Sequence, residues 1–262
     1  MKVLVKLGGT LLDSPDTRHR LAAEIAAVQR AGTEVVVVHG GGKQMTRFLA
    51  ERGVESRFVG GLRVTTPEIL DAVLKIFAGS VNHELVAAFV QAGALPVGLS
   101  GIDACLVEAV PLNPDLGAVG RPVRSNPELL RILTAAGYLP VVACVAGDRA
   151  GNVYNVNADQ MAVACAAGLP VDKLLFLTDV EGVKDKNGNV IVRLRSAQAD
   201  RLIAEGVATG GMQAKLNAAI DALRLGVQEV FIAPGAVAGV TARLLAGEPL
   251  GSRMVAEGEI HG

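Results

Sequence analysis

The sequence has little aromatic character: it contains no tryptophan, and aromatic residues make up 3% of its 262 residues. Proteins that bind single-stranded nucleic acid stack bases on aromatic side chains, so that role is not expected here. The chain also lacks an excess of either charge, because 25 Lys and Arg residues nearly balance 26 Asp and Glu residues. A net charge of −1 argues against nucleic acid or an anionic membrane as the main partner.

Cysteine is scarce as well. Cys105, Cys144 and Cys165 lie far apart within apolar runs, and no CxxC or Cys/His spacing typical of a metal site is present. This pattern predicts buried, reduced thiols in a protein without a metal centre of its own. Lys6 interrupts the apolar run at the N-terminus, which argues against a signal peptide.

Long hydrophobic runs are absent too. The longest uncharged stretch, residues 85–102, contains three glycines and one proline, which predict a helix end, a turn and a short strand rather than a membrane span. We therefore expect a soluble cytoplasmic protein. Half of the residues are hydrophobic, so the chain can bury a large core, either as one domain or as two lobes.

Short apolar runs alternate along the chain with longer amphipathic runs. Strands that are buried on both faces of a parallel sheet show such unbroken runs of Val, Ile and Leu. The alternation predicts an α/β fold with a largely parallel sheet. The predicted strands are Lys2–Leu7, Glu34–Val38, Leu95–Leu99, Leu106–Val110, Leu139–Val145, Leu174–Leu177 and Glu229–Ala233.

The predicted helices have recognisable starts and ends. A capping side chain stands directly before a proline, which suits the first turn of a helix, at Ser14-Pro15, Thr66-Pro67 and Asn126-Pro127. Glycine, which favours the left-handed conformation that ends a helix, stands at Gly32, Gly53, Gly93, Gly137, Gly168 and Gly226. A boundary between two lobes is expected near residues 168–170.

Glycines also cluster where strands should end. Gly8 and Gly9 follow the first predicted strand, and Gly40–Gly42 follow the second. Ligands bind beyond the carboxyl ends of strands in open parallel sheets, and free N–H groups at a helix start attract anions. The two loops indicate a phosphate or oxyanion site, with tight strand-to-helix turns as the alternative. His39, at the end of the second strand, is interpreted as a hydrogen-bonded structural residue.

Charged residues stand near these and two further loops. Lys6 ends an apolar strand and should face the same crevice, although a strand-end lysine can also extend to solvent. Asp159 lies near a helix start, where a carboxylate favours the dipole and can reach an ammonium group; helix capping by Asn157 is the alternative. Lys215 lies one turn into a helix that opens with Gly-Gly, and periodicity alone favours a solvated lysine there. Arg63 precedes a helix, and its guanidinium suits a planar carboxylate unless it lies on the surface.

Taken together, these clusters make the sequence similar to the amino acid kinase family. Each motif alone is weak, but the set is highly specific, occurs in the family's order and covers nearly the whole chain. The motifs are Lys6–Gly9, His39–Gly42, Gly61–Thr65, Asn155–Asp159, Thr178–Val183 and Gly211–Lys215, followed by a terminal strand at 251–255.

The resemblance implies a three-layer αβα sandwich with a mainly parallel central sheet, divided into two lobes. Residues 1–170 would bind the amino acid substrate and form a homodimer, and residues 171–262 would bind the nucleotide. The stretch Gly61–Thr65 favours the branch that phosphorylates the side-chain carboxylate of N-acetyl-L-glutamate, a step of arginine synthesis, over branches that act on aspartate, uridylate or carbamate. ATP and Mg²⁺ are the implied cofactors, and the sequence leaves open whether the metal ion has a ligand on the protein.

The same resemblance assigns the site residues. Lys6 and Lys215 would stabilise the phosphoryl group in transfer, and Asp159 would orient both lysines. Arg63 and Asn155 would hold the α-carboxylate and the acetamido group of the substrate. Backbone N–H groups around the reacting oxygens would come from Gly8, Gly9, Gly41 and Gly42. The nucleotide-binding residues would be Asp179, Val180, Glu181, Gly182, Val183, Lys184, Val207, Ala208 and Thr209.

Two features depart from the family pattern. The loop Ser100–Ala104 differs from the Gly-Lys-Asp-Gly often found there, which leaves open a longer, carrier-linked aminoadipate as substrate. The chain begins at its first strand, without the extra N-terminal helix that links arginine-inhibited family members into hexamers. We therefore expect an arginine-insensitive homodimer.

Other classes of protein stay open on the sequence alone. A non-catalytic nucleotide- or oxyanion-binding protein on the same fold would not require Lys6, Asp159 and Lys215 together. A nicotinamide-dependent dehydrogenase would require the GxGxxG motif, which is absent. A kinase of the same family that acts on another acidic amino acid is the third alternative.

Overall fold

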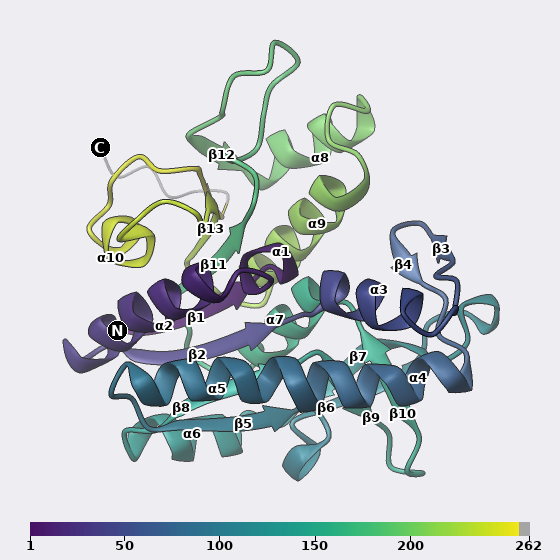
Figure 1. The fold of residues 1–262 in the computed structure, drawn as a ribbon. Helices are drawn as coiled ribbons and strands as arrows, with labels where there is room; N and C mark the ends of the chain where they lie inside the picture. Colours follow the sequence, from purple (N-terminus) through teal and green to yellow (C-terminus); the bar gives the residue numbers. More distant parts are fainter. Residues whose placement is uncertain (257–262) are drawn as a thin grey trace.

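An eight-stranded sheet forms the centre of the protein. The computed structural model describes residues 1–256 and is drawn in Figure 1. The strand order is β12-β14-β13-β11-β1-β2-β8-β5, and every neighbouring pair is parallel except β13 and β14. The strands are β1 (Lys2–Leu7), β2 (Glu34–His39), β5 (Pro96–Ser100), β8 (Leu139–Ala143), β11 (Lys173–Thr178), β12 (Arg193–Arg195), β13 (Glu229–Pro234) and β14 (Ser252–Val255). The predicted mainly parallel sheet is confirmed.

Helices cover both faces of this sheet, as Figure 1 shows. The helices α2, α5 and α10 lie on one face, and α6, α7 and α9 lie on the other, with α8 packed on α9. β1, β2 and β11 are buried along nearly their whole length between these layers, which explains their unbroken apolar sequences. The helices are α1 (Gly9–Leu12), α2 (Pro15–Arg30), α3 (Gly42–Ala50), α5 (Asn82–Gln91), α6 (Glu128–Ala135), α7 (Ala158–Ala166), α8 (Ser196–Ala204), α9 (Gly210–Arg224) and α10 (Val240–Leu245).

One long helix runs alongside the sheet. It comprises α4 (Pro67–Val73), the π-helical segment η1 (Leu74–Val81) and α5. Among residues 1–256, this helix is long and apolar enough to cross a membrane by length and composition alone, with a mean hydropathy of 1.4. In the fold it packs against α2, β5 and β8, so its apolar face belongs to the core.

A second, smaller sheet projects beyond the central one. It is a closed four-stranded barrel of β6 (Val107–Pro111), β7 (Val119–Ser125), β9 (Val145–Gly147) and β10 (Val153–Val156), in the order β10-β7-β6-β9. The predicted strand Leu139–Val145 is therefore wrong in one respect: the chain leaves the central sheet at Cys144 and enters the barrel. A hairpin of β3 (Phe58–Val59) and β4 (Leu62–Arg63) stands nearby, and the short turns η2 (Asp103–Cys105) and η3 (Pro114–Leu116) complete the fold.

Most predicted helix boundaries are confirmed. The side chains of Ser14 and Thr66 cap α2 and α4, each accepting an N–H at 3.3 Å. The start at Asn126 is wrong: α6 begins at Glu128, and the Asn126 amide instead donates to the carbonyl of Ala104 at 3.1 Å. The six glycines predicted to end helices all have positive φ, from +69° to +99°.

Two further predictions concern Cys105 and the C-terminus. Cys144 and Cys165 are buried as predicted, but Cys105 is exposed. Cys105 lies in η2 with a φ of +52°, two residues before β6 begins at Val107. The predicted terminal strand is confirmed as β14, and residues 257–262 of the predicted second lobe lie outside the described residues.

Candidate active site

Three charged side chains that are remote in the sequence meet at the carboxyl edge of the central sheet. Lys6 lies near the end of β1, Asp159 is the second residue of α7, and Lys215 lies in the second turn of α9. The Nζ atom of Lys6 is 2.7 Å from Oδ1 of Asp159, and the Nζ atom of Lys215 is 3.3 Å from Oδ2 of the same carboxylate. One carboxylate therefore holds two ammonium groups, one on each oxygen.

Two members of this cluster are almost excluded from water, and the side chain of the third, Lys215, is 17% exposed. Lys6 is 6% exposed and Asp159 is 4% exposed. Burial raises the pKa of the Asp159 carboxyl, but the ammonium groups of Lys6 and Lys215 together outweigh burial and leave that pKa below its usual value. Asp159 is therefore ionised at neutral pH. The cluster keeps an excess of positive charge, which suits an anionic phosphoryl group in transfer.

The start of α7 explains how Asp159 reaches both lysines. Asn157 caps the helix, because its Oδ1 atom accepts the N–H groups of Asp159 at 2.8 Å and of Gln160 at 3.3 Å. The predicted capping role of Asn157 is confirmed. The cap and the two ion pairs coexist because the cap uses the backbone of Asp159 and leaves its carboxylate free for the lysines.

Two glycine loops lie beside the cluster. Gly9 begins α1 after β1, and Gly41 and Gly42 lie at the start of α3 after β2. The loops approach so closely that a Cβ atom on Gly9 would lie 3.1 Å from the nitrogen of Gly42. The N–H of Gly8 donates to the carbonyl of Leu177 at 2.9 Å, so the expected free N–H at Gly8 is engaged by the sheet in this structure.

A cavity of about 220 Å³ opens between these loops and the β3–β4 hairpin. The four residues predicted to bind the substrate, Gly41, Gly42, Arg63 and Asn155, all line it, together with Lys6 and Gly9. Sequence reasoning missed the apolar part of the wall, because a single apolar residue carries no signal that distinguishes a cavity wall from the core. That part includes Phe58, Leu62, Phe77, Val119, Cys144 and Val156.

Arg63 reaches the cavity from β4 and is 7% exposed. Its Nη2 atom donates to the carbonyl of Gly42 at 3.2 Å and to Oγ1 of Thr46 at 2.9 Å, and Nη1 donates to Ser56. The guanidinium also lies over the ring of Phe58, 4.6 Å from its centroid. Burial lowers the pKa of Arg63, yet a guanidinium stays charged at neutral pH. Arg63 is thus a fixed, partly satisfied cation at the cavity wall.

Asn155 reaches the same cavity from β10. Its amide donates to Oγ1 of Thr65 at 3.0 Å, and that hydroxyl donates to the carbonyl of Arg63 at 2.9 Å. Thr65 is fully buried, and Gly117 packs so closely that a Cβ atom there would lie 2.3 Å from the Thr65 carbonyl oxygen. One buried threonine therefore joins the side chain of Asn155 to the backbone of Arg63.

The predicted nucleotide-binding segments flank Lys215. Residues 179–184 follow β11, and residues 207–209 directly precede α9. Burial raises the pKa of Asp179, but hydrogen bonds from Thr178 and Thr10 and the charge of Lys215 outweigh burial and lower that pKa overall. Among residues 1–256, no group of three or more His, Cys, Asp and Glu side chains is arranged to hold a metal ion.

His39 lies beneath the second glycine loop and is fully buried. Its Nδ1 atom is 2.9 Å from the carbonyl oxygen of Gly40, and its Nε2 atom is 2.9 Å from the amide nitrogen of Asn82. Burial lowers the pKa of His39 to about 4, so the imidazole is neutral near pH 7. The interpretation of His39 as a hydrogen-bonded structural residue agrees with these contacts.

The lowered pKa of His39 predicts an acid-sensitive fold. The unfolded chain binds a proton at His39 below about pH 6.5, whereas the folded chain resists it down to about pH 4. Stability is therefore present above pH 6.5 and is lost as the pH falls. We expect the free energy of unfolding to drop by about 2 kcal/mol between pH 7 and pH 5, measured by urea denaturation. The drop should disappear in His39→Asn; an equal drop in that variant would contradict the assignment.

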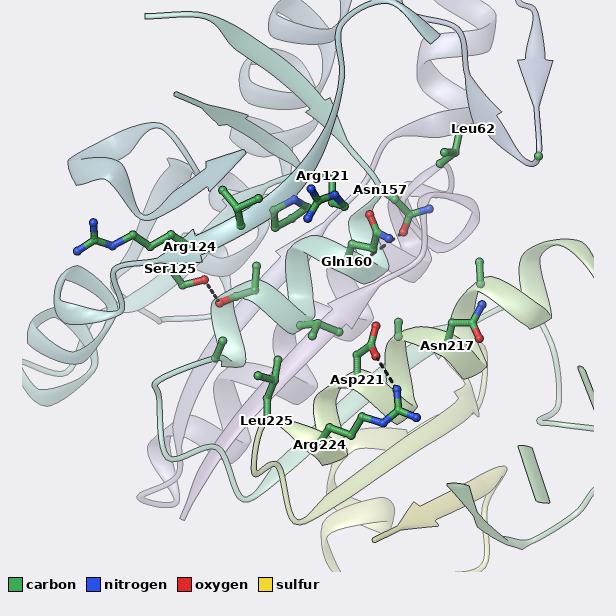
Figure 2. Close-up of a pocket in the computed structure, with 18 residues that line it drawn as sticks. Leu62, Arg121, Arg124, Ser125, Asn157, Gln160, Asn217, Asp221, Arg224 and Leu225 are labelled. Atoms are coloured by element: carbon green, nitrogen blue, oxygen red, sulfur yellow. Dashed lines mark hydrogen bonds and ion pairs between the residues drawn. The ribbon is translucent and has the colours of Figure 1, made fainter. Parts of the chain in front are cut away.

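A larger groove of about 660 Å³ lies next to the active-site cavity and shares Leu62 and Asn157 with it. Figure 2 shows this groove between β7 and α9, with α7 as its floor. Ser125 ties β7 to α7 by donating to the carbonyl of Ala164 at 2.6 Å. Lys6 lines the smaller cavity, whereas neither lysine of the cluster lines the groove.

Comparison with known proteins adds independent information. The family model described as "Amino acid kinase family" matches residues 1–234. The chain is 66% identical over 255 residues to the acetylglutamate kinase of Solibacter usitatus, covering 97% of this chain and 99% of that protein. It is 42% identical to the acetylglutamate kinase of Koribacter versatilis, covering 89% of this chain and 90% of that protein.

Solved structures show the same fold. The N-acetylglutamate synthase of Neisseria gonorrhoeae, complexed with coenzyme A and N-acetyl-glutamate, superposes with a TM-score of 0.88 at 25% identity. The match covers 98% of this chain and 60% of the synthase, so this chain corresponds to part of that protein. Carbamate kinase from Giardia lamblia bound to AMP-PNP has a TM-score of 0.74 at 17% identity, with 98% of each chain covered.

Proposed function

The chain belongs to the amino acid kinase family, and on that premise we propose that it is an acetylglutamate kinase. The enzyme uses ATP to phosphorylate the side-chain carboxylate of N-acetyl-L-glutamate, giving N-acetyl-L-glutamyl 5-phosphate for arginine biosynthesis. The observation that carries the proposal is the buried cluster of Lys6, Asp159 and Lys215 beside two glycine loops. The acetylglutamate kinases with 66% and 42% identity support the choice of substrate.

The chemistry of this reaction matches what the site contains. A side-chain carboxylate with a pKa near 4.3 is already ionised at neutral pH, so the acceptor needs no general base. Catalysis then depends on holding the acceptor in line with the γ-phosphate and on stabilising charge on the transferring phosphoryl group. Positive side chains and backbone N–H groups perform both tasks, and these are the groups that line the cavity.

Each side chain has a role in this proposal. Lys6 and Lys215 are the catalytic residues, because their ammonium groups stabilise the phosphoryl group in flight. Asp159 is a positioning residue that holds both ammonium groups. Arg63 and Asn155 bind the α-carboxylate and the acetamido group in a cavity of about 220 Å³, a volume suited to a small acylated amino acid.

The nucleotide is MgATP. Residues 179–184, which follow β11, and residues 207–209, which precede α9, bind it. The described residues offer no cluster of protein ligands for a metal ion. Mg²⁺ keeps several waters and binds mainly through substrate phosphates, so in this proposal the ATP phosphates hold it.

The proposed division into two lobes separates the amino acid site from the nucleotide site. Residues lining the amino acid cavity fall between Lys6 and Ala158, which supports residues 1–170 as the substrate lobe and 171–262 as the nucleotide lobe.

Val90 and Leu95, near the end of α5, are 59% and 63% exposed, and this apolar surface supports a homodimer formed by the first lobe. The enzyme works in the cytoplasm. Light scattering that gives the mass of a monomer or a hexamer would contradict the dimer.

The test of the function is to trap the acyl phosphate with hydroxylamine. Purified protein is incubated with MgATP and, separately, N-acetyl-L-glutamate, glutamate, aspartate or N-acetyl-aminoadipate. We expect hydroxamate and ADP mainly with N-acetyl-L-glutamate. The loop Ser100–Ala104 is not part of the cavity wall, which argues against a preference for aminoadipate. Faster turnover of N-acetyl-aminoadipate would overturn the proposed substrate. ATP binding without any turnover would support a non-catalytic binding protein.

Arg63 provides a prediction about substrate affinity. The variant Arg63→Ala should raise the KM for N-acetyl-L-glutamate by about 10- to 100-fold, the size of one lost charge-assisted contact, with a smaller effect on kcat. Arg131→Ala is the matched control, because Arg131 is an exposed arginine paired with Glu128 on α6. An unchanged KM together with a lost kcat would instead move Arg63 into the chemical step.

A further inference from the structure

His39 occupies a buried link between the long helix and the second glycine loop. On one side its Nδ1 atom lies 2.9 Å from the Gly40 carbonyl oxygen, and on the other its Nε2 atom lies 2.9 Å from the Asn82 amide nitrogen. The same amide nitrogen is 2.9 Å from the carbonyl oxygen of Val141. These contacts connect β8, α5 and β2 to the loop that lines the active-site cavity.

The chemistry of the link fixes where each proton lies. The Val141 carbonyl can only accept, so it selects the NH₂ face of the Asn82 amide. The second N–H of that amide then points at Nε2 of His39, which must accept and therefore carries no proton. The remaining proton is on Nδ1, where it donates to the Gly40 carbonyl. The backbone of β8 thus selects the histidine tautomer through Asn82.

This tautomer determines the direction of one backbone donor. In a planar trans peptide, the C=O of residue i and the N–H of residue i+1 point in opposite directions. Because His39 draws the Gly40 carbonyl into the interior, the N–H of Gly41 faces the opposite way. Gly41 lines the active-site cavity, so this N–H is directed toward the space that the acceptor carboxylate would occupy.

The surrounding packing leaves little freedom for this arrangement. A Cβ atom on Gly41 would lie 2.8 Å from the ring of Phe77, and one on Gly98 would lie 2.3 Å from Oδ1 of Asn82. Phe77 belongs to the π-helical segment η1, and Asn82 follows directly after it. π-Helical segments are frequent at functional sites. Here the segment places Phe77 against Gly41. The residue directly after the segment, Asn82, contacts His39.

We propose that His39 and Asn82 are positioning residues for phosphoryl transfer, because they hold the Gly40–Gly41 peptide with its N–H directed at the acceptor carboxylate. The inference rests on the proposed function for the identity of the acceptor. Neither side chain contacts the substrate in this proposal; both act through the orientation of Gly41.

Two substitutions of His39 separate positioning from simple packing. His39→Asn keeps a donor close to the position of Nδ1 and loses the contact with Asn82. His39→Gln keeps an acceptor close to the position of Nε2 and loses the donor to Gly40. Each variant loses one buried hydrogen bond, so their losses of thermal stability should be similar. We expect kcat with N-acetyl-L-glutamate to decrease by no more than about 5-fold in His39→Asn. In His39→Gln we expect a decrease of about 10²-fold, the scale for one misdirected oxyanion donor.

The control and the contrary outcomes are defined by the same assay. His19→Gln changes an exposed histidine on α2 and should leave kcat unchanged. Equal loss of kcat in the two His39 variants would show a packing role only and overturn the positioning role. Nitrogen-15 NMR of the wild-type protein provides a test that needs no turnover: we expect a neutral His39 with its proton on Nδ1, and a proton on Nε2 would overturn the proposal. Wild-type protein that makes no hydroxamate would overturn the proposed function, while the NMR result would still report on His39.

Discussion

Replacing Lys215 or Lys6 with alanine is expected to lower kcat by about 10²–10³, the range for one preorganised donor to transition-state charge. The KM for either substrate should change less, because the lysines act mainly as negative charge develops in transfer. Lys215 gives the simpler experiment, since its side chain is 17% exposed whereas that of Lys6 is 8% exposed. Single-turnover kinetics at saturating MgATP would measure the chemical step directly.

Lys75→Ala is the matched control for both lysine variants. Lys75 lies on the long helix, is 62% exposed and pairs only with Asp71 among the described residues. The Lys75→Ala variant should therefore retain the wild-type kcat. Near-normal turnover in Lys6→Ala or Lys215→Ala would refute the phosphoryl-transfer assignment of the cluster, whatever happens to KM.

Replacing Asp159 with asparagine is expected to damage both turnover and stability. The two ammonium groups that now share one carboxylate would face a neutral amide and repel each other in a buried site. Removing one partner of a buried ion pair costs about 3–5 kcal/mol, so the free energy of unfolding should drop by about that amount. Turnover should fall by about 10³, because both lysines lose their fixed positions.

Asp221→Asn provides the comparison for the Asp159 variant. Asp221 is an exposed acid on α9 whose carboxylate lies 3.5 Å from Arg224, and surface pairs of this kind contribute about 0–1 kcal/mol. Urea denaturation and kcat measured on both variants would separate a buried from a surface effect. A stable Asp159→Asn protein with normal kcat would contradict the proposed role of the carboxylate.

The sequence predicted the central sheet well because the pattern is local. Unbroken apolar runs such as Lys2–Leu7 are imposed by burial on both faces, and capping residues such as Ser14 act within one turn of helix. The barrel strand β7 was not predicted, because its exposed Arg121 and Arg124 and its internal Pro122 interrupt any such pattern. The break at Cys144 was missed for a related reason: the apolar run continues while the chain changes sheets.

The candidate site was predicted in part. The meeting of Lys6, Asp159 and Lys215 was expected because each stands next to a distinctive loop and the set resembles a family. Walls such as Phe58 and Phe77 were not, since their position depends on tertiary packing between segments far apart in the chain. The partnership of His39 with Asn82 is of the same kind, as 43 residues separate them.

The central position of β1 has a consequence for how the enzyme tolerates change. β1 is hydrogen-bonded to β2 on one side and β11 on the other, and neighbouring strands lie about 4.8 Å apart. The loop proposed to bind the amino acid follows β2, and the segment proposed to bind the nucleotide follows β11. On that assignment, the span between donor and acceptor is set by interstrand spacing that side chains cannot alter. Substitutions around the edge of the site can therefore change the affinity for either substrate without lengthening the distance over which the phosphoryl group is transferred.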